Sequence, residues 1–285
     1  VVDMHPENDT LAVLGMMTSA SGIYTIGATG DFLTVGDAVS FINNSGVCGP
    51  TVFNIQTGVY DEQVTIGNIA GTSAVNTITF QSLSGNASDV TVQYAASALA
   101  DNWVWRLDGS SFITVQNLTI KSTTSSTYGR VVEIYSGATE NNFFNNILEA
   151  PINNSSNTSV IYDYTGNNNN NVYDGNHLIG GYYCAYFRGS GTTSLQEGTV
   201  FTNNTLEDFY YYGIYSYYQD GIDITGNTVS NGSSSGSVYG IYAYYNDNDR
   251  RIVGNTINVS GTGTNYGIYM NYNDGTAANP GLVAN

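Results

Sequence analysis

The sequence predicts an all-β fold, a parallel β-helix whose stacked coils are covered at the N-terminal end by one short helix. Three observations carry this prediction. An amide side chain returns every 23 to 30 residues, large apolar residues flank it at fixed distances, and a Tyr-Gly-Ile-Tyr segment recurs late in the chain. Leucine-rich repeats share this period, but they need a denser leucine pattern and a helical return, and the sequence shows neither.

The short helix is expected at residues 34–42. Thr34 fits the N-cap position, and Asp37, three residues on, fits a capping box. One apolar stripe follows at helical spacing, formed by Val35, Ala38, Val39 and Ile42. A helix of this kind covers the open end of a solenoid, where the core and unpaired backbone would otherwise meet water.

The amide positions set the period of the coils. In chain order they are Gln116, Asn146, Asn176, Asn204, Asn227 and Asn255. A large apolar or aromatic residue stands three positions before each amide, and Leu, Val or Ile stands two positions after it. Coils stack at about 4.8 Å, so equivalent side chains form ladders. Stacked amides at an inward turn satisfy one another's hydrogen bonds.

A second repeated segment predicts strands with one buried and one outward column. The buried column is Val132, Ile161, Ala185, Ile214, Ile241 and Ile268. The residues that follow form the outward column, Glu133, Tyr162, Tyr186, Tyr215, Tyr242 and Tyr269. Asp163 falls at an inward position and does not fit this pattern.

These patterns divide the chain into three parts. We expect a lead-in at residues 1–20, the cap with the first strands at 21–70, and the coils at 71–285. The coils are expected to end in a partial rung or to continue in a longer polypeptide or assembly.

Composition narrows the classes of function. The chain has 23 acidic and 6 basic residues and a net charge of −17. Nucleic acids and anionic membrane surfaces need clustered Lys and Arg, so this charge argues against both as partners. No apolar run approaches the length of about 18 residues that spans a bilayer. Abundant Asn, Ser and Thr with little Lys favour a secreted protein, and Cys48 and Cys184 are compatible with one disulfide or two free thiols.

The chain resembles the right-handed parallel β-helix superfamily that includes pectate lyases and pectin esterases. The residues that carry the resemblance are the amide positions, the Gly-Ile-Tyr rungs and the segment 58–64, Gly-Val-Tyr-Asp-Glu-Gln-Val. Residues 30–66 also look like large surface proteins, adhesins among them, that are exported by the type IX secretion route. The superfamily contains both enzymes and inert stalks, so the resemblance implies a fold and leaves the activity open.

Outward tyrosines are the candidate ligand-binding residues. They are Tyr162, Tyr186, Tyr215, Tyr217, Tyr242, Tyr244 and Tyr269. In one interpretation their rings form a platform for sugars or for a partner's apolar surface, beside a trough left by Gly213, Gly240 and Gly267. In the other they stack only to stabilise neighbouring coils.

An acidic ladder is the candidate metal site. Asp220, Asp247 and Asp274 each follow the first Tyr of their rung by eight residues. Like charges repel at the spacing of one coil unless a cation bridges them, and Ca²⁺ prefers carboxylate and amide oxygens. A structural calcium ion is therefore one interpretation, and three separate solvated turn residues are the other.

Two functions follow from these observations. The first is a non-catalytic, secreted or cell-surface β-helix that acts in adhesion or as a stalk and binds a glycan or a surface protein. The alternative is a polysaccharide lyase or glycoside hydrolase, with Arg188, Glu133 and Asp163 as the best available catalytic residues. Hydrolases need carboxylates that converge across the scissile bond, and the inward register of Asp163 argues against such a pair. The sequence favours binding.

Overall fold

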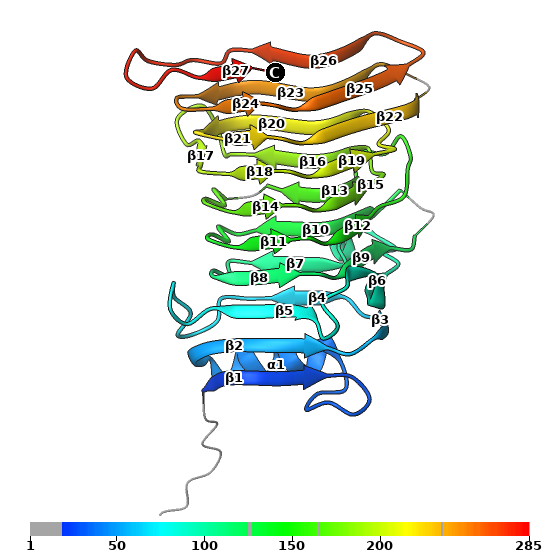
Figure 1. Ribbon diagram of the computed structural model, residues 1–285, viewed down its shortest axis with the longest axis vertical. Coiled ribbons are helices and arrows are strands. Elements are labelled where there is room, and N and C mark those ends of the chain that lie inside the picture. The colour runs from blue at the N-terminus through cyan, green and yellow to red at the C-terminus, as the bar shows by residue number, and fades with distance from the viewer. Residues whose placement is uncertain (1–18, 125–126, 165, 235, 285) are drawn as a thin grey trace, which may run out of the picture.

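A computed structural model describes residues 19–124, 127–164, 166–234 and 236–284 of the chain. It is a parallel β-solenoid of about nine turns with three sheets, which we call A, B and C (Figure 1). Neighbouring strands of each sheet come from consecutive coils, and they pair in parallel. The prediction of an all-β solenoid is confirmed.

Each sheet collects one strand from successive coils. Sheet A contains β1 (Ala20–Ile26), β2 (Val47–Ile55), β5 (Ile78–Ser82), β8 (Ile113–Gln116), β11 (Asn142–Phe144), β14 (Val172–Asp174), β18 (Val200–Thr202), β21 (Asp223–Thr225), β24 (Arg251–Val253) and β27 (Leu282–Ala284). Sheet B contains β3 (Gly58–Asp61), β6 (Val90–Tyr94), β9 (Thr119–Ser122), β12 (Ile147–Glu149), β15 (His177–Ile179), β19 (Thr205–Glu207), β22 (Thr228–Ser234) and β25 (Thr256–Gly261).

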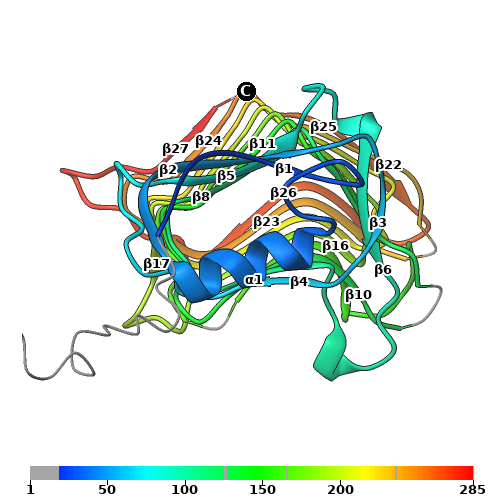
Figure 2. The same ribbon diagram turned by 90° about the horizontal axis from the view of Figure 1, so that it is seen from below.

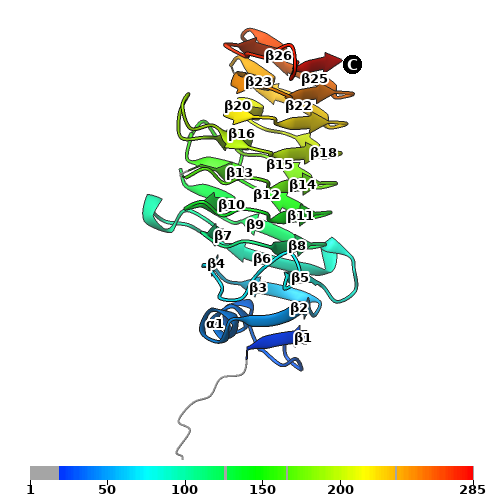
Figure 3. The ribbon, with the colours of Figure 1, turned by 90° about the vertical axis from the view of Figure 1, so that its left-hand side faces the viewer.

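Sheet C carries the outward tyrosines. It contains β4 (Val64–Ile66), β7 (Trp105–Asp108), β10 (Gly129–Tyr135), β13 (Thr158–Asp163), β16 (Tyr183–Arg188), β20 (Tyr212–Asp220), β23 (Val238–Asp247) and β26 (Asn265–Asn271), with the short β17 (Gln196–Glu197) beside β20. Short 3-10 turns lie at Ala87–Asp89 and Leu99–Asp101. Figure 3 shows the coils stacked along one axis, with sheets on different sides of the stack.

Helix α1 (Val35–Ser45) lies across the N-terminal end of the stack (Figure 2). The capping box of Thr34 and Asp37 is present, and the predicted apolar stripe is buried. The helix runs three residues beyond the predicted 42 and ends at Gly46, whose φ of 64° interrupts helical geometry. The Glu62 carboxylate accepts hydrogen bonds from the backbone N–H groups of Val35 (3.0 Å) and Gly36 (2.7 Å), so it neutralises the positive end of the helix.

The amide column forms, but it begins one coil later than the sequence predicts. From Asn146 to Asn255, each side-chain amide donates to the side-chain oxygen of the next at 3.0–3.1 Å and to a backbone carbonyl one coil before. Gln116 is not part of it, because Gln116 pairs with Phe144 and points outward to Gln81. Leu118 takes the equivalent place, since its N–H donates to Asn146 Oδ1.

The core is a continuous stack of apolar side chains inside the three sheets. The predicted inward column from Val132 to Ile241 is completely buried. Gly213 and Gly240 also face the interior, where an added Cβ would lie 2.5 Å from the Gly240 carbonyl oxygen and the Ile257 side chain respectively. The predicted outward trough beside the tyrosines was therefore wrong. These glycines allow the coils to pack closely at a corner.

The two cysteines are not bonded to each other. Cys48 is exposed and Cys184 is buried, and both are free. Burial raises the pKa of the Cys184 thiol well above its usual value. In the described part of the chain, no helix is long and apolar enough to cross a membrane.

Candidate functional site

Five tyrosines on consecutive coils of sheet C form one stack, which we call the tyrosine column. Its members are Tyr162, Tyr186, Tyr215, Tyr242 and Tyr269. Neighbouring ring centroids lie 4.9–5.0 Å apart, and their planes differ by 2–12°. The strands place the residues in register, one over another. The column that the sequence predicts is therefore present from β13 to β26.

A second stack, which the sequence analysis did not identify, stands beside the first. This edge column consists of Tyr183, Tyr212, Tyr239 and Tyr266, with centroids 4.7–5.2 Å apart. Its rings lie at 69–87° to those of the tyrosine column. The signal was present in the sequence, because the first Tyr of the Tyr-Gly-Ile-Tyr segment repeats as strictly as the last.

The two columns pack as a herringbone, and we call them together the tyrosine array. Parallel rings whose centroids are about 5 Å apart must be offset, because carbon atoms in contact are about 3.5–4.0 Å apart. Stacking therefore covers the ring faces, and a ligand would meet ring edges and phenolic hydroxyl groups. This differs from the flat platform that the sequence analysis expected. The same stacking also stabilises the coils against one another, as the second interpretation expects, and ligand binding by the array stays a prediction.

Burial raises the pKa of several phenols of the array. It raises the pKa of Tyr162 and of Tyr242 to about 12. Burial also raises the pKa of Tyr186 and Tyr215. At neutral pH each hydroxyl can thus donate one hydrogen bond and accept others.

Tyr217 and Tyr244 continue the array along the strands. Their ring centroids lie 5.1 Å apart with the planes at 73°. Tyr217 also contacts the ring of Tyr215 at 6.0 Å, edge to face. All seven tyrosines proposed as ligand-binding residues therefore lie on one face of sheet C. Tyr186 is buried there, with 7% of the residue exposed, and the other six are partly exposed.

Arg188 is held within this face by aromatic rings. Its guanidinium lies 4.9 Å from the ring centroid of Tyr164 and 5.4 Å from that of Tyr217. Its Nη1 donates a hydrogen bond of 3.4 Å to the hydroxyl of Tyr186. Its Nε is buried and has no hydrogen-bond partner. Cation–π contacts of this kind hold a charged group in place without a carboxylate.

Glu133 belongs to a buried ion cluster at the N-terminal end of the same face. One carboxylate oxygen pairs with Arg106 at 2.5 Å and the other with Arg130 at 2.6 Å, and only 1% of the residue is exposed. The Arg106 guanidinium stacks on Trp103 at 3.2 Å, and that of Arg130 stacks on Tyr162 at 3.5 Å. Arg106 was not among the predicted site residues, although it stands directly beside Glu133 in the ladder between β7 and β10.

Asp163 lies in the core, as its misfit in the sequence pattern suggested. It is completely buried and accepts hydrogen bonds from Asn168 (2.7 Å), Tyr173 (3.1 Å) and Gln196 (3.2 Å). Burial raises its pKa to about 7, against the smaller opposite effect of these three donors. The side chain therefore does not reach the outer face.

The three candidate catalytic residues are not brought together. Asp163 is inside the solenoid, and both oxygens of Glu133 are engaged by arginines. Arg188 is two strands from Glu133, near the rings of Tyr164, which follows β13, and Tyr217 of β20. Glycoside hydrolysis needs a pair of carboxyl groups across the scissile bond, and these residues do not provide such a pair.

The acidic ladder lies at one end of the strands of sheet C. Asp220 and Asp247 are in register, and Asp247 accepts a hydrogen bond of 3.1 Å from the backbone N–H of Asp274. Asp220 accepts one of 2.7 Å from the Asn248 amide. Among the residues that the structure describes, no group of three or more His, Cys, Asp or Glu side chains is arranged to hold a metal ion. The calcium site stays a prediction.

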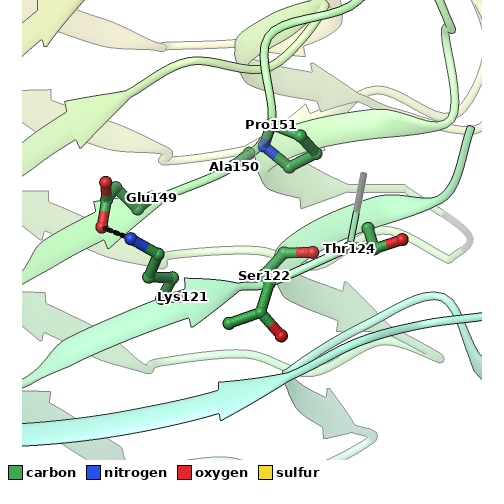
Figure 4. A pocket seen from close by; sticks show the side chains of 7 residues that line it. Lys121, Ser122, Thr124, Glu149, Ala150 and Pro151 are labelled. Atoms are coloured by element: carbon green, nitrogen blue, oxygen red, sulfur yellow. Dashed lines mark ion pairs between the residues drawn. The ribbon is translucent and has the colours of Figure 1, made fainter. Parts of the chain in front are cut away.

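A separate hollow of about 320 Å³ opens on sheet B (Figure 4). Lys121 and Glu149 form an ion pair of 2.8 Å at its wall, and Pro151 closes one side. On the same sheet the His177 ring lies 2.7 Å from a Glu207 carboxylate oxygen, and its side chain is partly exposed. This hollow has no aromatic lining.

Comparisons with known proteins establish the fold. No family model matches the sequence, and no curated protein matches it significantly. The structure matches a pectin methylesterase from Aspergillus niger with a TM-score of 0.55 and 14% identity, over 92% of this chain and 93% of the enzyme. It matches the pectin methylesterase PemA from Erwinia chrysanthemi with a TM-score of 0.56 and 12% identity, over 94% of both chains. The chain is a right-handed parallel β-helix of the pectin-lyase-like fold.

Another match of this β-helix is a GH136 lacto-N-biosidase from Eubacterium ramulus, with a TM-score of 0.53, 10% identity and coverage of 92% of this chain and 57% of the enzyme. A further pectin methylesterase, with a TM-score of 0.56 and 12% identity over 93% of this chain and 94% of the enzyme, was solved in complex with a hexasaccharide. These structural neighbours are named as enzymes that act on carbohydrates. Identities this low establish the fold alone. Export by type IX secretion receives no support.

Proposed function

We propose that this β-helix binds a polysaccharide along the outer face of sheet C, with the tyrosine array as its contact surface. One observation carries the proposal: five phenols stand in a single stack on consecutive coils, flanked by a second stack. A repeating surface suits a repeating ligand. The structural relatives are named for action on carbohydrates, and one holds a hexasaccharide, which supports a glycan over a protein partner.

The chemistry of the array suits sugar hydroxyl groups. Neutral phenols both donate and accept hydrogen bonds, and each such bond contributes about 0.5–1.5 kcal/mol. Several bonds along one chain add up, whereas a single sugar makes few. The Arg188 guanidinium adds fixed donors at one point of the face. We therefore expect affinity for polymers and weak binding of monosaccharides.

The second candidate is a polysaccharide lyase or glycoside hydrolase. The names of the structural relatives favour it. Its site would lie on the same face, near Arg188 and Glu133, where the chain has both a cation and a carboxylate. Against it stands the engagement of both Glu133 oxygens by Arg106 and Arg130. A role in adhesion or as a stalk of a secreted protein belongs to the binding proposal and stays a prediction.

Affinity electrophoresis in gels that contain neutral or uronate polysaccharides tests the binding proposal. The parent chain should be retarded by at least one polysaccharide, and a variant with Tyr215→Ala and Tyr242→Ala should migrate as in an empty gel. Tyr24→Phe, in the N-terminal cap, is the matched control and should be retarded like the parent. Free migration of the parent in every gel contradicts the proposal.

Incubation with the same polysaccharides separates binding from catalysis. Reducing ends report hydrolysis, and ultraviolet absorbance reports the unsaturated product of a lyase. The binding proposal expects neither signal above that of a boiled sample. Product that appears with the parent chain and disappears with Arg188→Ala would establish the enzyme candidate instead.

A further inference from the structure

We infer that the polysaccharide is an uncharged, extended β-1,4-linked chain that runs parallel to the solenoid axis, with one sugar residue over each coil. This inference rests on the proposed function and adds the class of ligand and its direction. Two observations carry it: the spacing of the tyrosine array and the charge of the surface around it.

The first observation is the distance between tyrosine rings on successive coils. Ring centroids of the tyrosine column follow one another at 4.9, 4.9, 5.0 and 5.0 Å, and those of the edge column at 5.2, 5.2 and 4.7 Å. A fully extended β-1,4-linked glycan advances by nearly this distance per sugar. Each successive sugar then lies over an equivalent phenol, because the repeat of the glycan matches the repeat of the coils. Coiled α-1,4-linked glucans rise by much less per sugar and lose the match after one or two contacts.

The charge of the surface selects an uncharged polymer. On β20, β23 and β26 the outward side chains alongside the array carry no charge. They are Tyr212, Tyr215 and Tyr217 on β20, Tyr239, Tyr242 and Tyr244 on β23, and Tyr266, Tyr269 and Asn271 on β26. A uronate chain would place one carboxylate on these phenols at every coil. Desolvating a charge without a partner is costly.

The rest of the protein adds to this selection. Strands β20 and β23 end in Asp220 and Asp247, and the whole chain carries a net charge of −17. Arginines gather only at the N-terminal part of the face. Two of them are paired with Glu133, and Arg188 stands at a single rung. A polyanion would therefore meet Arg188 and the partly neutralised Glu133 cluster at one end of the face, and repulsion at the rungs that end in Asp220 and Asp247.

Isothermal titration calorimetry with pure oligosaccharides from dimer to octamer tests the inference. Cello-, chito-, xylo- and manno-oligomers represent neutral β-1,4-linked chains, malto-oligomers represent a neutral α-1,4-linked chain, and oligogalacturonates represent a charged α-1,4-linked chain. We expect Kd of at least one neutral β-linked series to fall with length to the pentamer, which matches the five rungs of the tyrosine column, and then to level off. Malto-oligomers and oligogalacturonates of the same length should bind at least about tenfold more weakly.

The variants Tyr242→Phe and Tyr242→Arg separate shape from charge. The first keeps the ring and removes one hydroxyl, so the affinity for the neutral pentamer should fall several-fold while the fold is retained. The second should gain affinity for oligogalacturonates, because it supplies a counter-charge at a second rung. Tyr24→Phe is the control and should leave every Kd unchanged.

Failure of the inference differs from failure of the proposed function. Oligogalacturonates that bind more tightly than neutral oligomers, or a Kd that ignores length or linkage, overturn the inference and leave polysaccharide binding in place. The absence of binding to every oligosaccharide, together with free migration in every polysaccharide gel, overturns both.

Discussion

The variant Asp163→Asn is expected to gain stability relative to the parent chain as the pH rises. Asp163 is fully buried, and its pKa is raised from 3.8 to about 7 in the folded protein. Between these values the folded chain holds a proton that the unfolded chain has released. The unfolded state then binds fewer protons than the native state, so the free energy of unfolding falls as the pH rises.

The size of this effect follows from the two pKa values. They differ by about three, and each unit corresponds to 1.36 kcal/mol, so the full loss is about 4 kcal/mol and is complete above pH 7. About 1.5 kcal/mol of it is already lost at pH 5, which leaves about 3 kcal/mol to be lost between pH 5 and pH 8. Asp31 and Asp101 have lowered pKa values. Their contribution to the free energy of unfolding therefore increases with pH, and it changes at pH values below this window.

An asparagine at this position fits the surroundings. Asn168 can still donate to the amide oxygen, and the Tyr173 hydroxyl can turn to accept. The Gln196 amide can rotate to present Oε1, which has no partner in the parent chain. Urea unfolding followed by circular dichroism at several pH values measures the difference. A parent chain whose urea midpoint is as flat between pH 5 and pH 8 as that of Asp163→Asn would refute the reasoning.

Other predictions concern the amide column, the cap and the thiols. Asn176→Ala should lower the free energy of unfolding by about 3 kcal/mol or more, because it leaves buried donors and acceptors of two coils without partners; an unchanged urea midpoint would count against the ladder. Glu62→Ala should cost about 1 kcal/mol by removing the acceptor at the N-terminus of α1, with the loss visible in thermal melting. A thiol reagent should modify Cys48 in the native protein and Cys184 only after unfolding; mass spectrometry that finds both modified at once contradicts the burial.

The coils could be predicted from sequence where the repeat is strict. The amides recur with the same neighbours from Asn146 onward, and the Tyr-Gly-Ile-Tyr segments recur from Tyr212 onward. The amide column and its register are confirmed there. The first coils lack these segments, so Gln116 was taken for a member of the column although its side chain points outward. The residues three before and two after Gln116, Ile113 and Leu118, are both buried, because the chain turns at Asn117, whose φ is 54°. The flanking apolar residues therefore did not expose the error.

The candidate site could be predicted only in outline. Strand alternation places the tyrosines outside, but the angle between two columns of rings depends on packing across coils. The pairing of Arg106 with Glu133 joins residues 27 positions apart and requires the register of β7 and β10. Gly213 was placed on the surface because the corner that turns it inward has no signature in a single segment.

Oxidative footprinting with and without a bound polysaccharide tests most directly whether the outer face of sheet C is the contact surface. Hydroxyl radicals modify exposed side chains, and mass spectrometry locates each modification. We predict protection of the partly exposed tyrosines on β16, β20, β23 and β26 and unchanged modification of sheets A and B. Protection at the hollow around Lys121 on sheet B, with the tyrosine array still modified, would contradict the account.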